Sequence, residues 1–197
     1  MMKIDLLPDR ADYYTQLKSI YDPVNSCQVH AAVQCLDIIG EVSKIAGPNL
    51  RPADNLWFLA NNDPEILAFC KKSHGFNNPT VDNIVEWADV LVMTINKAVG
   101  YEAAYFSEYG LNDILLDLAD LLPLMASLKW PERKISGHYV SIVGFDTNSD
   151  GGTSFFIIAD PWKNTLKGTL DGFRNIYPVA VFDRHFKGYG IRFRRRS

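Results

Sequence analysis

The stretch that decides the fold is Ser136 to Asp146, which reads Ser-Gly-His-Tyr-Val-Ser-Ile-Val-Gly-Phe-Asp. A second run, Phe155 to Ala159, is equally short and apolar, and both are rich in the β-branched and aromatic residues that are typical of strands. Between them, Asp146 to Gly152 is a strong hairpin or loop signal. The pattern predicts two antiparallel strands that place His138, at the start of the first, and Asp160, after the second, at the same edge of a sheet.

Outward from this hairpin, the chain divides into helices followed by strands. Residues 1–25 are expected to be irregular. Apolar residues at spacings of three and four predict helices at 26–47, 55–70, 80–99 and 111–122. Short apolar runs predict further strands at 101–106, 124–130 and 179–182. This order favours an α+β fold in a single domain, 1–197, with a helical part at about 26–122 and a β-sheet part at about 123–197.

Composition describes an ordinary globular protein, since 47% of the 197 residues are hydrophobic and 12% are aromatic. The net charge of −3 gives no argument for a nucleic-acid partner. The N-terminus has no apolar run of signal-peptide length, and no stretch reaches the roughly 18 apolar residues of a membrane helix. We expect synthesis in the cytoplasm, although release by lysis, in a virion or through a specialised secretion route would leave no such mark.

Basic residues gather at the C-terminus: Arg192, Arg194, Arg195 and Arg196. Such a tail is usually a solvated terminus, which is the interpretation we favour, but it could also contact phosphates or an anionic membrane surface.

Three cysteines, without a Cys-x-x-Cys pair, predict neither a disulfide framework nor a zinc site. Cys27 follows Ser26, a good N-cap residue, so it is expected at the start of a helix. There the free N–H groups and partial positive charge stabilise a thiolate, which makes Cys27 the candidate nucleophile. Cys35 and Cys70 are expected to be small buried hydrophobes.

A thiol nucleophile needs a base, and His138 is the best placed of the four histidines. It stands at a strand end, which is a rigid mount, and Gly137 before it leaves room for a substrate backbone. His30 shares the helix of Cys27, where a polar-face or partly buried position is the simpler interpretation. Asp160 would accept the second ring N–H of His138, although Asp-Pro also commonly just ends a strand.

An attacked carbonyl oxygen becomes negatively charged and needs hydrogen-bond donors. The backbone N–H of Cys27 is one candidate donor. The side chain of Gln16 is the best-placed second donor, and Asn25 is a poorer alternative.

The chain resembles the papain-like domains related to double-glycine leader peptidases, many of which occur in bacteria and phages. The resemblance rests on residues 13–16, 25–29, 136–146 and 158–162. It implies a papain-like fold in which Gln16, Cys27, His138 and Asp160 serve as oxyanion donor, nucleophile, base and orienter. Relatives often have Gly-Pro or Asn-Val-Thr-Ser after the cysteine, whereas Gln28-Val29-His30 follows here, so His30 could enlarge or charge the substrate cleft.

These features together favour amide hydrolysis through an acyl-enzyme on Cys27, without metal or cofactor. The substrate could be a protein, a leader peptide or a peptidoglycan stem peptide. One alternative is an acyl transferase of transglutaminase type, which uses the same triad. The other is a non-catalytic papain-like binding module.

Overall fold

The computed structural model describes residues 2–7, 16, 20, 26–75, 87–130, 135–162 and 172–196. The helices in these ranges are α1 (Cys27–Ile38), α2 (Val42–Ile45), α3 (Pro52–Asn62), α4 (Pro64–His74), α5 (Ala88–Ala98), α6 (Leu111–Ala119) and α7 (Val179–His185). The strands are β1 (Lys3–Asp5), β2 (Tyr101–Phe106), β3 (Leu124–Trp130), β4 (Ile135–Thr147), β5 (Thr153–Ala159), β6 (Asn175–Pro178) and β7 (Phe186–Arg195).

The strands form one antiparallel sheet in the order β2-β7-β3-β4-β5-β6, with β1 paired to β4. The long strand β4 is the centre of this arrangement, because it pairs with β1, β3 and β5. A Cβ on Gly144 would collide with the backbone carbonyl of Ile4, so glycine is what allows β1 to lie against β4. The predicted hairpin is present, and the chain turns at Asn148–Gly152 between β4 and β5.

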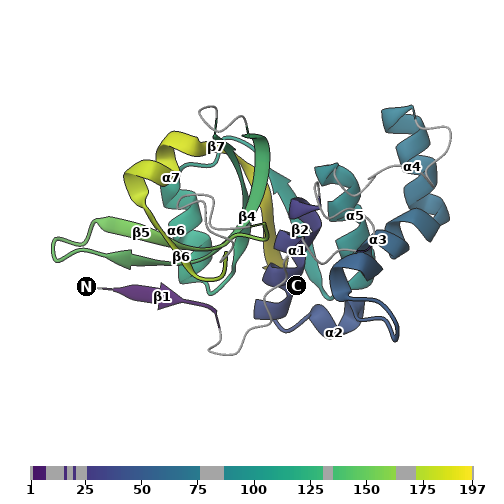
Figure 1. Ribbon diagram of the computed structural model, residues 1–197, viewed down its shortest axis with the longest axis horizontal. Coiled ribbons are helices and arrows are strands. Elements are labelled where there is room, and N and C mark those ends of the chain that lie inside the picture. The colour runs from purple at the N-terminus through teal and green to yellow at the C-terminus, as the bar shows by residue number, and fades with distance from the viewer. Residues whose placement is uncertain are drawn as a thin grey trace.

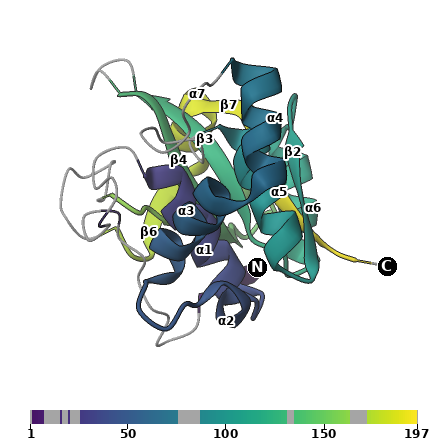
Figure 2. The same ribbon diagram turned by 90° about the vertical axis from the view of Figure 1, so that its right-hand side faces the viewer.

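Both faces of the sheet are covered. One face packs with α1, α3, α4 and α5 in a single core cluster, to which the sheet contributes Met125, Ile191 and Phe193. The other face curls around a second core with α6 and α7, which includes Val140, Ile142 and Phe156. Figure 1 shows α1 between the sheet and helices α3 to α5, and Figure 2 shows these helices from the front. The predicted α+β fold is therefore confirmed.

Helix α1 differs from its prediction in two ways. Every residue from Gln28 to Leu36 is buried, because the helix lies between β3, β4 and α3 and exposes no polar face. It also ends at Ile38, well before Gly47. The reason is Gly40, whose φ of 77° is the left-handed conformation that commonly ends helices.

The segment 179–182, predicted as a strand, is helix α7. Phe182 and His185, three residues apart, are both buried, and the Phe182 ring packs 4.8 Å from the ring of Phe156. This packing outweighs the preference of the β-branched residues for strands. Strand β1 also shows that residues 3–5, predicted to be irregular, belong to the sheet. The predicted helix start near Thr80 lies outside the described residues.

The backbone near the C-terminus belongs to the sheet, while the side chains of Arg194, Arg195 and Arg196 are exposed to solvent. Arg192, Arg194 and Arg195 lie on β7, which is paired on both sides by β2 and β3. Arg192 donates to the Tyr109 hydroxyl at 2.6 Å, and Arg196 donates to the carbonyl of Asn96. Within the described ranges, no helix has both the length and the apolar composition that crossing a bilayer requires.

Candidate active site

Cys27 is the first residue of α1, as predicted, and its side chain is partly exposed. Ser26 occupies the N-cap position, but its hydroxyl makes no capping hydrogen bond. The Ser26 carbonyl instead accepts two bonds from His30, one from the backbone N–H at 3.1 Å and one from Nδ1 at 2.9 Å. The backbone and the imidazole of His30 thus both hold Ser26 at the start of the helix, and this fixes the position of the Cys27 backbone.

His138 and Asp160 come together across the β4–β5 pair. Ser141 of β4 pairs with Ala159 of β5, so Asp160 falls beside the residues that precede Ser141. His138 Nε2 lies 2.6 Å from Asp160 Oδ1, and the two residues are only 2% and 0% exposed. The register predicted from the hairpin therefore does bring the two side chains into contact. The prediction that His138 begins the strand is wrong, because β4 begins at Ile135 and His138 is its fourth residue.

The second partner of His138 is Cys27, with which its ring shares a hydrogen bond. Because Nε2 is bonded to Asp160, Nδ1 is the ring nitrogen left for the thiol. Burial by itself would lower the pKa of His138, but the charge and hydrogen bond of Asp160, followed by Cys27, outweigh it and raise this pKa to about 10. The site therefore favours a protonated imidazole beside the sulfur at neutral pH.

Gln16 reaches the same place from the N-terminal part of the chain. It is 1% exposed, and its backbone N–H donates to the carbonyl of Pro161 at 2.8 Å. Pro161 directly follows Asp160, so the structure brings Gln16 next to the His138–Asp160 pair. Asn25, the alternative oxyanion donor, lies outside the described residues.

Comparison with known proteins decides the family. The sequence model of the peptidase C39-like family matches residues 9–182, which include all four candidate site residues. The chain belongs to the peptidase C39-like family. It is therefore a cysteine peptidase, and the predicted relation to the double-glycine peptidases is confirmed.

A solved structure of a C39-like peptidase shows the same fold at low sequence identity, and two other solved peptidases are similar more distantly. A putative C39-like peptidase from Bacillus anthracis matches with a TM-score of 0.59 at 14% identity, over 100% of both chains. A double glycine motif protease from an AMS/PCAT transporter, solved with its leader peptide, also covers 100% of both chains, with a TM-score of 0.48 at 14% identity. The peptidase domain of Streptococcus ComA matches with a TM-score of 0.47 at 18% identity, over 88% of this chain and 93% of that domain. No curated protein sequence matches the chain.

Two further residues of this C39-like peptidase support the candidate site. The backbone N–H of Trp162 donates to Asp160 Oδ1 at 3.0 Å, and its ring lies edge-on to His138 with 6.0 Å between centroids. The Ser141 hydroxyl, on β4, donates to the Ala31 carbonyl of α1 at 2.9 Å. Sequence reasoning gave neither residue a role. The signals that could have found them are the tryptophan after Asp-Pro and a serine inside an otherwise apolar strand.

The remaining histidines have other partners. His30 is buried, and burial first, partly offset by its bond to Ser26, lowers its pKa. The hypothesis that His30 enlarges or charges the substrate cleft stays a prediction. His74 lies 2.9 Å from Asp89, and His185 Nδ1 lies 2.8 Å from the Lys129 carbonyl.

The other two thiols are unsuited to nucleophilic chemistry. Cys35 and Cys70 are both fully buried. Burial, slightly offset by the interaction with the Ser141 hydroxyl, raises the pKa of Cys35 to about 12. Burial and then the charge of Asp89 raise the pKa of Cys70. Both sulfurs therefore stay protonated at neutral pH.

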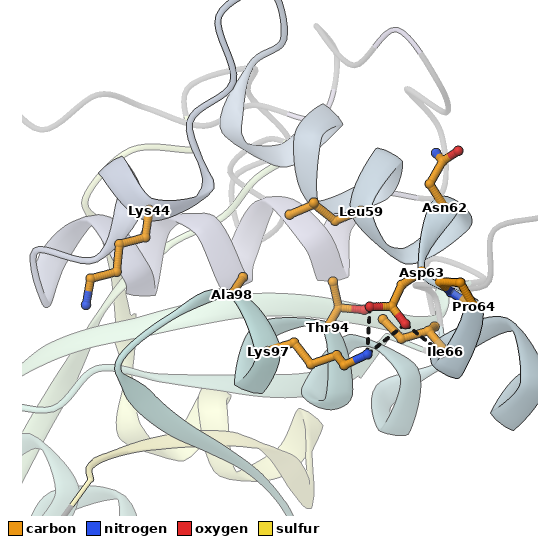
Figure 3. A pocket seen from close by; sticks show the side chains of 9 residues that line it. All are labelled: Lys44, Leu59, Asn62, Asp63, Pro64, Ile66, Thr94, Lys97 and Ala98. Carbon is orange, nitrogen blue, oxygen red and sulfur yellow. Dashed lines mark hydrogen bonds and ion pairs between the residues drawn. The ribbon is translucent and has the colours of Figure 1, made fainter.

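Figure 3 shows a cavity of about 390 Å³ on the helical part, with residues of α2 to α5 around it. Lys97 crosses this cavity to Asp63, whose carboxylate it meets at 2.6 Å. None of the candidate site residues lines this cavity, so it is separate from the thiol. Among the described residues, no three His, Cys, Asp or Glu side chains are grouped closely enough to hold a metal ion.

Proposed function

We propose that this peptidase cleaves an amide bond through an acyl-enzyme on Cys27. The observation that carries the proposal is that one buried imidazole, His138, is hydrogen-bonded to both the Cys27 thiol and the Asp160 carboxylate. A thiolate held beside an imidazolium attacks the substrate carbonyl carbon and forms a C–S bond. The C–N bond then breaks as His138 gives its proton to the leaving amine, and water, deprotonated by His138, releases the acid and restores the thiol.

Each support of the imidazole has a chemical role in this scheme. Asp160, which also accepts the Trp162 N–H, orients the ring and stabilises its positive charge. The Trp162 ring covers one side of His138, so less water reaches the ion pair and its electrostatic attraction is stronger. The hydrogen bond of Ser141 to α1 fixes the strand that carries the base against the helix that carries the nucleophile.

The substrate is proposed to be a protein, a leader peptide or a peptidoglycan stem peptide. The surroundings of Gly137 support a substrate with an extended peptide backbone. Gly137 is exposed, and a Cβ built there would meet nothing within 4 Å. Open space directly before His138 is where a substrate chain would run past the base.

Selective alkylation of Cys27 tests the proposal. In folded protein near neutral pH, iodoacetamide should modify Cys27 at least about 10²-fold faster than Cys35 or Cys70, because it alone combines exposure with an imidazole partner. Peptide mass mapping over time measures the three rates. The Cys27→Ala variant, which should fold normally and hydrolyse nothing, is the control. Equal labelling of all three thiols would contradict the proposal.

Gln16 is proposed to be an oxyanion donor, together with the backbone N–H of Cys27. Gln16→Ala should therefore lower turnover by about 10² to 10³ while leaving the iodoacetamide rate of Cys27 little changed, because the donor acts on the carbonyl oxygen and not on the sulfur. Gln16→Glu is the matched variant, since it keeps the length of the side chain but loses the amide donor. Wild-type turnover in both variants would make Gln16 a structural residue.

A further inference from the structure

A second cavity, of about 400 Å³, lies between the helical part and the sheet. We call this cavity the aromatic pocket, and the described residues that line it are His74, Trp87, Ala88, Asp89, Tyr105 and Tyr139. The helical wall comes from the last residue of α4 and the start of α5. The sheet wall comes from β2 and β4.

The register of the sheet explains why the two tyrosines share one wall. Tyr105 pairs with Ile191, Ile191 with Met125, and Met125 with Ser141, which lies two residues after Tyr139 and therefore on its face. This is the face on which Ser141 meets α1.

The pocket also reaches the candidate nucleophile. Tyr139 directly follows His138, and burial first, then the nearby charges of Tyr105, Tyr189 and Cys27, raise the pKa of its hydroxyl. Ser141, two residues after Tyr139, donates to the Ala31 carbonyl one turn after Cys27, so Tyr139 lies on the part of β4 that runs beside the start of α1. A side chain in the pocket would belong to a residue near the bond held at Cys27.

The pocket contains an acidic group. Among its described lining residues, Asp89 is the single carboxylate, with 48% of its side chain exposed, and no lysine or arginine occurs. His74 stacks on Trp87 with 3.9 Å between ring centroids and meets Asp89 through Nε2 at 2.9 Å. Aromatic faces beside a carboxylate attract a cation and disfavour an anion.

We propose that the aromatic pocket binds the lysine or arginine side chain of a peptide substrate, so that the enzyme prefers peptides with a basic residue close to the cleaved bond. This assignment rests on the proposed acyl-enzyme chemistry at Cys27. The assignment concerns which substrate side chain the site prefers, and the acyl-enzyme chemistry does not determine that preference.

The test uses peptidyl chloromethyl ketones, which alkylate a peptidase thiol after binding as substrates do. Lysine or norleucine is placed in turn at each of the three positions before the ketone, because norleucine keeps most of the apolar length without the charge. At one position the lysine probe should label Cys27 about tenfold faster than the norleucine probe. Iodoacetamide, run in parallel, reports the thiol independently of peptide binding.

Two variants connect this preference to the pocket. Asp89→Asn keeps the hydrogen bond to the Val90 N–H but loses the charge, and Tyr105→Leu removes one aromatic face. Each should reduce the lysine-to-norleucine ratio at least about threefold. Asp150→Asn, which removes an exposed carboxylate at the tip of the β4–β5 hairpin, is the matched control and should keep the ratio.

The outcomes separate the two proposals. A norleucine probe that reacts as fast as its lysine counterpart at every position, or a preference that survives Asp89→Asn, would overturn the pocket assignment alone. If iodoacetamide and all the probes label Cys27 no faster than Cys35, the chemistry at Cys27 fails, and the pocket assignment fails with it.

Discussion

Replacing His138 with alanine should lower hydrolysis by about 10⁴ to 10⁶-fold, because the proposed base and acid of the reaction are then both lost. The same change should slow alkylation of Cys27 near neutral pH, since the thiolate loses the imidazolium that stabilises it. Rates of peptide hydrolysis and of iodoacetamide labelling, measured on the same protein, test both effects. If Cys27 stayed as reactive as in the wild type, the two side chains would not be partners.

Loss of folding must be separated from loss of chemistry in this experiment. His138 is 2% exposed, and its removal leaves the buried carboxylate of Asp160 without its imidazole, which costs about 3 to 5 kcal/mol of stability by analogy with broken buried ion pairs. His138→Gln, which can still donate to Asp160, is the less disruptive variant. His185→Gln controls for removal of a buried histidine elsewhere. Melting temperatures should accompany every rate.

Asp160→Asn should reduce activity by less than the roughly 10⁴-fold that the corresponding change costs in serine peptidases, because an asparagine can still orient the ring. Asp160→Ala should cost more, because the imidazole then loses its acceptor altogether. Both changes act on a group that touches His138 directly, and kcat/KM of the two variants measures the difference. Equal activity in all three proteins would reduce the site to a simple Cys27–His138 pair.

The pH dependence gives a second, independent measure of Asp160. Its charge raises the pKa of His138, so the alkaline limb of kcat/KM should lie well above pH 7 in the wild type and move to lower pH in Asp160→Asn. The free energy of unfolding of the wild type should also depend on the protonation of His138. The folded pKa of about 10 exceeds the ordinary value of 6.5, so this contribution is complete below about pH 6.5 and is lost as the pH rises toward 10.

Local signals made much of the fold and of the site predictable. The hairpin between β4 and β5 has turn residues that fix its register, and this register was enough to predict that His138 and Asp160 meet. The start of α1 at Cys27 followed from Ser26 and the apolar spacing. Each of these predictions depends on neighbours within about 25 residues.

Features set by tertiary packing were not predictable in the same way. The sequence 179–182 has the composition of a strand. It forms a helix because Phe182 packs against Phe156 in the core, and this tertiary contact outweighs the local preference. The arginines of β7 look like a polar tail in the sequence, but β2 pairs with all three of them and β3 pairs with Arg192. Ser141 supports the site only through a carbonyl 110 residues away in the sequence, which no local pattern reveals.

That long separation has a consequence for the newly synthesised chain. α1 leaves the ribosome about 110 residues ahead of the part of β4 that fastens to it, and well before Asp160 exists to hold the imidazole. Until then the sulfur of Cys27 has no proton acceptor and behaves as an ordinary thiol. The nascent polypeptide would thus carry an unreactive cysteine, and reactivity toward peptide bonds would arise only after β4 and Asp160 have been made and have packed against α1.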